Sequence, residues 1–213
     1  MSLLEDTNNP NPQPRVVSVA RYPKDPKYYY LDGSGVFLVD KILFKVQATL
    51  IFGPRPMPFI RQAGPLIPMY IEDIIPMLPS SNDHNPIEIS GITATQFQDY
   101  LLILLGRPYD GEYSKLITSY KDSTVLKPSK DICIRYLDIA TLARRFGILQ
   151  LEEWAIDTLH AIFTGSAGRF ASMASESWDS DTVLRPRAFT KATNTNLSAL
   201  VFIQYLISLS SRD

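Results

Sequence analysis

The residue types that most often carry out catalysis or bind metals are scarce in this sequence. The chain of 213 residues contains two histidines, His84 and His160, and one cysteine, Cys133. A zinc site needs three or four closely placed ligands, and a histidine base needs a nucleophile within hydrogen-bond reach. Because the spacing provides neither, we expect no metal, no cofactor and no catalytic residue. We expect Cys133 to be a small core residue on its helix.

Two short glycine stretches do not match the motifs that they partly share. Gly33-Ser34-Gly35 lacks the G-x-G-x-x-G spacing and precedes a strand pattern, whereas phosphate sites use the amides of a helix N-terminus. Residues 165–168 read G-S-A-G and follow a helical pattern, unlike the G-x-S-x-G nucleophile elbow. We interpret the first as a turn leading into a strand and the second as a helix exit.

Charge and hydropathy exclude further classes of function. The net charge is −1 with acids and bases interleaved, so we expect no large nucleic-acid surface. No run approaches the ~18 apolar residues of a membrane span, and the N-terminus lacks the basic and apolar regions of a signal peptide. A single cysteine fits a reducing compartment. We therefore expect an intracellular protein, in cytoplasm or nucleus, that contacts neither nucleic acid nor membrane.

The elements expected in the N-terminal half centre on a hairpin. Residues 1–20 are predicted to be a lead that is disordered or forms an edge strand. Two β-branched and aromatic runs, 36–39 and 43–46, predict a hairpin turning at Asp40-Lys41. Seven prolines between 54 and 79 predict an irregular segment over 53–79, with room only for a short helix near 69–75 that ends at Pro76.

The C-terminal half is predicted to be mainly helical. A brief strand at 87–89 precedes a capping box formed by Thr93 and Gln96, which predicts a helix stopped by Gly106. Residues 109–130 read as irregular. Helices over about 130–146 and 151–163, separated by Gly147, predict an αα-hairpin, with Glu152 on its outer side.

Four stretches occur in an order that is similar to one known family. They are DPKYYYLDGSGVFLVDKILFKVQ (25–47), IEDIIPMLP (71–79), NPIEISGITATQFQDYLLILLGRPY (85–109) and YLDIATLARRFGILQLEEWAIDTL (136–159). They resemble the first hairpin, second helix, third strand with third helix, and closing helical pair of a BTB/POZ domain, in the divergent form common in fungal proteins. The family's turn glycine is Lys41 here, and its histidine is Gln47.

The resemblance implies an α+β fold and a function in protein–protein interaction. The implied BTB/POZ-like domain spans 25–163 and has a small three-stranded sheet with a cluster of α-helices. A C-terminal helical extension, weakly structured at first, follows over 164–213. The implied function is non-enzymatic homo- or hetero-oligomerisation, or adaptor contacts with other proteins. The candidate interaction surface comprises Ile51, Phe52, Phe59, Ile60, Met69, Tyr70, Val201 and Tyr205.

Three alternatives remain open from the sequence. Some members of the family are substrate adaptors of cullin-type ubiquitin ligases, so a cullin is a possible partner. A small hydrolase using His84 or His160 is a less favoured reading. The third alternative is that the chain has no stable fold, because the prolines interrupt the segment where the family builds much of its dimer face.

Overall fold

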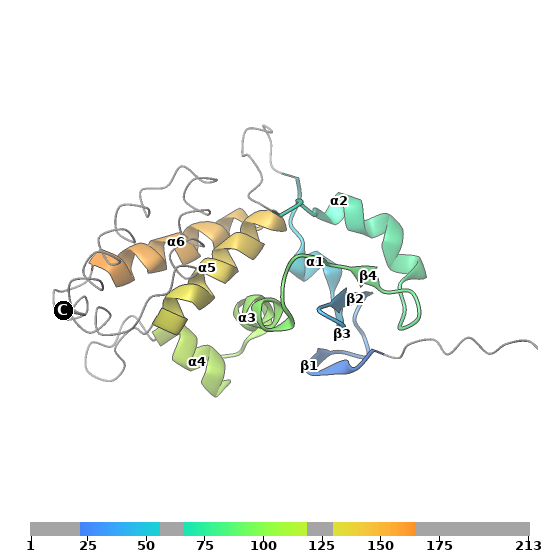
Figure 1. Ribbon diagram of the computed structural model, residues 1–213, viewed down its shortest axis with the longest axis horizontal. Helices are drawn as coiled ribbons and strands as arrows, with labels where there is room; N and C mark the ends of the chain where they lie inside the picture. The colour runs from blue at the N-terminus through green and yellow to red at the C-terminus, as the bar shows by residue number, and fades with distance from the viewer. Residues whose placement is uncertain (1–21, 56–65, 119–129, 165–213) are drawn as a thin grey trace, which may run out of the picture.

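The structure, a computed structural model, describes residues 22–55, 66–118 and 130–164. It is an α+β fold in which a sheet and a group of helices stand side by side (Figure 1). The strands are β1 (Lys24–Tyr29), β2 (Gly35–Val39), β3 (Ile42–Val46) and β4 (Ile87–Glu88). The helices are α1 (Ala48–Ile51), α2 (Ile71–Ile74), the 3-10 helix η1 (Ile75–Ser80), α3 (Ala94–Leu105), α4 (Gly111–Thr118), α5 (Lys130–Arg145) and α6 (Leu149–Thr164).

The predicted hairpin is confirmed. Strands β2 and β3 pair antiparallel, with Phe37 opposite Phe44. The two turn residues have positive φ, 47° at Asp40 and 64° at Lys41. Positive φ at both positions is the geometry that matches the right-handed twist of the flanking strands, which explains how the turn closes without glycine.

The sheet has four strands rather than the three predicted. Its order is β1-β3-β2-β4, with β1 parallel to β3 and β4 parallel to β2. The sequence-based reading missed β1 because it contains Pro26, which removes a backbone donor. Proline is tolerated on an edge strand, and β1 is an edge strand. Strand β4 confirms the brief strand predicted at 87–89.

The segment after the hairpin is broken into short turns. Helix α1 lasts four residues, and its C-cap Phe52 is already extended. The short helix predicted at 69–75 begins at Ile71, where Tyr70 and Asp73 form a capping box. The α-helix ends at Ile74, just before Pro76, in agreement with the predicted stop. The chain continues as η1, which has Pro76 in its first turn, where proline is accepted.

Helix α3 follows the predicted start and stop. Thr93 accepts a hydrogen bond from the Gln96 amide at 3.2 Å, and the Gln96 side chain accepts one from the Thr93 amide at 2.9 Å. Gly106 is the C-cap. The prediction that 109–130 is irregular is wrong for α4, where Asp110 accepts hydrogen bonds from the amides of Glu112 and Tyr113 and thereby caps the helix start.

The αα-hairpin is also confirmed. Helices α5 and α6 pack along one another, and Gly147 turns the chain between them at φ 76°. Glu152 is the exception: it is 2% exposed instead of outward-facing. It lies 3.3 Å from the Arg144 guanidinium, so an ion pair inside the turn accounts for its burial.

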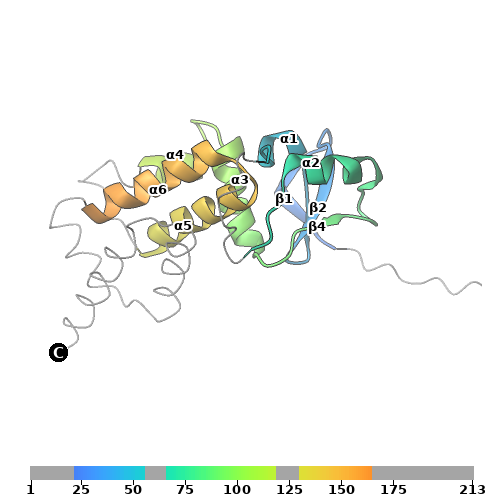
Figure 2. The same cartoon turned by 90° about the horizontal axis from the view of Figure 1, so that it is seen from above.

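The core lies between the sheet and the helices. Helix α3 stands between the sheet and the α5–α6 pair, while α1 and α2 lie along another side of the sheet (Figure 2). A connected set of aromatic rings fills this space, formed by Phe37, Phe44, Phe52, Phe97, Tyr100 and Phe146. Within the described ranges, no helix combines the length and the apolar character that crossing a membrane requires.

Candidate functional site

The residues that sequence analysis considered for catalysis lie on three different elements. His84 is exposed in the loop before β4, His160 is exposed on α6, and Cys133 is buried in α5, as expected of a core thiol. Gly33 belongs to the turn before β2, where a Cβ would lie 2.7 Å from the carbonyl carbon of Lys45. Across the part of the chain that the structure describes, no group of three or more His, Cys, Asp or Glu residues is placed to hold a metal ion.

Two residues of the predicted interaction surface are core residues. Ile51 is fully buried, and Phe52 is 2% exposed. Because α1 ends after one turn, the chain bends inward there, and the Phe52 ring packs edge-on against Phe146 at 4.9 Å. The Ile51 carbonyl accepts a hydrogen bond from the Tyr100 hydroxyl at 2.7 Å. The prediction that Ile51 and Phe52 form an exposed surface is therefore wrong.

Two more, Met69 and Tyr70, are half-buried in an internal junction. The Met69 amide donates to the Arg145 carbonyl at 2.9 Å. Tyr70 lies close to Gly147, where a Cβ would come 2.9 Å from its ring. These contacts join the chain before α2 to the α5–α6 turn. The remaining residues of the predicted surface, Phe59, Ile60, Val201 and Tyr205, lie outside the described residues.

Arg145 completes the same junction. Although Arg145 lies in the last turn of α5, its side chain is only 6% exposed. Its guanidinium donates to the carbonyl of Ile67 at 2.9 Å and to that of Ser90 at 2.9 Å. Burial lowers the pKa of Arg145. The side chain therefore connects α5 to the chain before α2 and to the chain after β4.

Three exposed apolar side chains lie on α1 and η1. Leu50 on α1 is 53% exposed, and on η1 Ile75 is 53% and Met77 41% exposed. Helix α1 contacts α2, which continues directly into η1, so these side chains belong to neighbouring elements on one side of the sheet (Figure 2). We call Leu50, Ile75 and Met77 the α1–η1 face. None of these three residues is among those predicted from the sequence for an interaction surface.

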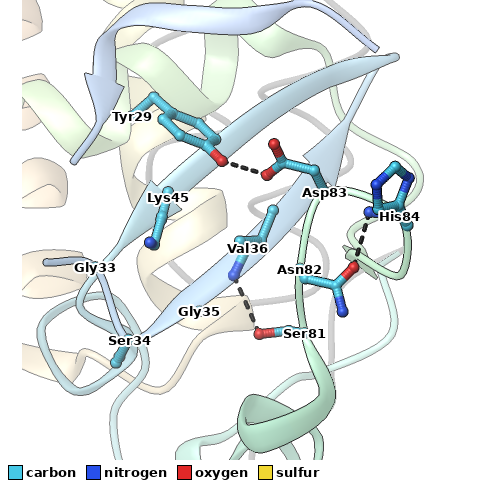
Figure 3. A pocket seen from close by; sticks show the side chains of 10 residues that line it. All are labelled: Tyr29, Gly33, Ser34, Gly35, Val36, Lys45, Ser81, Asn82, Asp83 and His84. Atoms are coloured by element: carbon cyan, nitrogen blue, oxygen red, sulfur yellow. Dashed lines mark hydrogen bonds between the residues drawn. The ribbon is translucent and has the colours of Figure 1, made fainter. Parts of the chain in front are cut away.

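A pocket of about 430 Å³ lies on the face of the sheet that points away from α3. Its floor includes Val36 and Lys45, which sit opposite each other on β2 and β3 (Figure 3). The turn before β2 and the loop 81–84 form its walls. The Val36 amide donates to the Ser81 hydroxyl oxygen at 3.3 Å, which fixes the loop against the start of β2.

Tyr29 and Asp83 line the pocket, and both contact Lys24, which is not one of the lining residues. The Tyr29 hydroxyl donates a hydrogen bond to the Asp83 carboxylate, and the Lys24 ammonium lies 2.7 Å from the same group. The hydrogen bond from Lys24, followed by that from Tyr29, lowers the pKa of Asp83. The negative charge of Asp83 is thus already compensated inside the protein.

The sequence contains no local signal for this pocket. Tyr29, Lys45 and Asp83 are far apart in the chain and match no motif, and only the pairing of β1 with β3 brings the first two together. The site contains hydroxyl, ammonium and amide donors beside the apolar side chain of Val36. Such a set of groups can bind and orient a ligand.

Comparison with known proteins gives no match. No protein-family model, no curated protein and no solved structure is significantly similar to this chain.

Proposed function

We propose that this chain is a BTB/POZ-like protein–protein interaction module without enzymatic activity, which mediates homo- or hetero-oligomerisation. The order of its elements supports the proposal. A β-hairpin is followed by two short helices, a strand parallel to β2, a capped helix and a helical hairpin. This order agrees with the four stretches whose sequences resemble the family.

The α1–η1 face carries the argument for association. Its three apolar side chains are each more than two-fifths exposed, whereas Ile51 on α1 and Ile74 at the end of α2, just before η1, are fully buried. Grouped apolar residues on a protein surface mark sites where another molecule binds, because association removes them from water. Methionine suits such a surface because its flexible side chain adapts to the partner.

Light scattering coupled to size-exclusion chromatography tests the proposal. We expect the wild-type chain to elute as an oligomer, and Leu50→Glu and Met77→Glu to shift it towards the monomer, because a charge in the interface must be desolvated. The matched control is Leu31→Glu, since Leu31 is 91% exposed in the turn before β2. A monomeric wild-type chain, or equal effects of Leu31→Glu and Leu50→Glu, would overturn self-association through this face.

Hetero-association is tested with the same variants. A cullin captured by the wild-type chain, and lost with Leu50→Glu but not with Leu31→Glu, would identify the adaptor alternative. Retention of the cullin by Leu50→Glu would place its binding elsewhere on the chain.

A further inference from the structure

The pocket on the outer face of the sheet has the chemistry of a second binding site. Lys45 lies at its floor, and its ammonium points into the space between Tyr29 and the turn at Gly33 (Figure 3). The Leu31 carbonyl accepts a hydrogen bond from this ammonium at 2.9 Å. A lysine ammonium has three N–H donors, and among the described residues no ion pair to Lys45 occurs. The ammonium is therefore held in place by one neutral acceptor, with donors to spare.

The other described residues around the pocket add no competing negative charge. Among the described residues that line the pocket, Asp83 is the one carboxylate, and it pairs with Lys24 at 2.7 Å and accepts a hydrogen bond from the Tyr29 hydroxyl. The Ser34 hydroxyl oxygen accepts from the Ala48 amide at 2.9 Å, which leaves its proton to donate. His84 also lines the pocket and is not an acidic residue. The pocket therefore favours an anion.

We propose that this pocket binds a carboxylate group, with the Lys45 ammonium as its charged partner and the Ser34 hydroxyl as a neutral donor. A single fixed ammonium with neutral donors matches a monoanion. Phosphate sites instead tend to use the paired donors of arginine or a row of backbone amides. The Val36 side chain and the Tyr29 ring provide an apolar surface for the carbon atoms that carry the carboxylate. This site is independent of the α1–η1 face and of assembly through it.

Nuclear magnetic resonance titration of the full chain tests the site with three alanine peptides. Two are capped at both ends and carry a central glutamate or a central glutamine. The third is capped at its N-terminus only and ends in a free C-terminal carboxylate. We expect at least one carboxylate peptide to shift the amide signals of Ser34, Lys45 and His84 at millimolar concentration, while the glutamine peptide does not. The tighter of the two carboxylate peptides identifies the source of the group as a side chain or a chain end.

Substitutions separate this site from general charge effects. Lys45→Gln should weaken carboxylate binding by about tenfold or more, because a hydrogen-bonded charge is lost, and Lys45→Arg should retain binding. The matched control is Lys115→Gln, the same change on the exposed surface of α4. Thermal unfolding of Lys45→Gln checks that the fold persists. Binding that is absent for every peptide, equal for glutamate and glutamine, or unchanged in Lys45→Gln would overturn the proposal.

Discussion

On one face of the sheet, Phe37 packs against the ring of Phe52, which follows α1, and Phe44 packs against that of Phe97 on α3. On the other face, Val36 and Lys45 form the floor of an open pocket. Both faces bury apolar side chains: Val46 is fully buried on the first, and Val36 is 4% exposed on the second. The two faces differ in the groups that cover them, which are aromatic rings on the first face and polar loop residues on the second. A closed face stabilises the fold, and an open face with polar walls is available to a ligand.

The three consecutive tyrosines show the same contrast within β1 and the residue after it. Tyr28 is 3% exposed and belongs to the core, Tyr29 lines the pocket, and Tyr30 is 40% exposed. Alternation along a strand sends neighbouring side chains to opposite faces. Identical residues therefore have different roles that depend only on their register.

The largest expected effect comes from opening the closed face. Phe44→Ala should lower the free energy of unfolding by about 3–5 kcal/mol, because it removes a buried ring and leaves a cavity. Phe44 is fully buried and packs edge-on against Phe97 at 5.0 Å. Urea denaturation followed by circular dichroism measures the change. A loss below about 1.5 kcal/mol would mean that the core collapses around the gap, and the closed face would not be rigid.

The second prediction concerns a buried carboxylate between β1 and α3. Asp25 is 2% exposed and accepts hydrogen bonds from the Tyr28 amide at 2.7 Å and from the Gln98 side chain at 2.6 Å. Asp25→Ala leaves these donors unpaired and should cost about 2 kcal/mol in urea denaturation. Asp32→Ala, in the exposed turn before β2, is the control and should change stability by less than about 0.5 kcal/mol.

A matched pair of valines compares the two faces directly. Val46→Ala on the closed face should cost about 2–3 kcal/mol, since the cavity adds to the lost transfer energy. Val36→Ala should cost about 1.5 kcal/mol, because a residue beside an open pocket leaves no closed cavity. The same denaturation experiment measures both. Equal losses would show that the outer face is packed as tightly as the inner one.

The smallest effect is expected at the exposed wall of the pocket. Asp83→Asn should lower stability at neutral pH by less than about 1 kcal/mol, since its ion pair with Lys24 is solvent-exposed. The pKa of Asp83 is lowered from 3.8, so its contribution is present above that pH and is lost as pH falls through the lower folded pKa. When the free energy of unfolding is measured against pH, the values for the wild type and Asp83→Asn should converge in acid. A difference that persists in acid would contradict the ion pair with Lys24 as its cause.

Local rules predicted the elements whose stabilising residues are close in sequence. The hairpin, the capping box of Thr93 and Gln96, and the αL turn at Gly147 were found because each depends on neighbouring side chains and backbone. Strand β1 and helix α4 were missed. Proline and polar residues disfavour strands and helices locally. The edge position of β1 nevertheless tolerates its proline, and a capping side chain stabilises the start of α4.

The candidate interaction surface was predicted less well for a related reason. Ile51 and Phe52 are apolar residues near a proline-rich segment, and hydrophobicity alone cannot distinguish an exposed apolar residue from a buried one. Leu50, their neighbour, is the exposed member. The direction of each side chain depends on where α1 ends.

The sequence by itself determined the hairpin and the helical pair, because periodicity and turn chemistry act over a few residues. Only the tertiary structure decided which charges are buried and which face of the sheet stays open. Arg145 finds its acceptors at Ile67 and Ser90, and Lys45 comes to face Tyr29 through the pairing of β1 with β3. Those partners are distant in the chain, so the folded backbone alone brings them together.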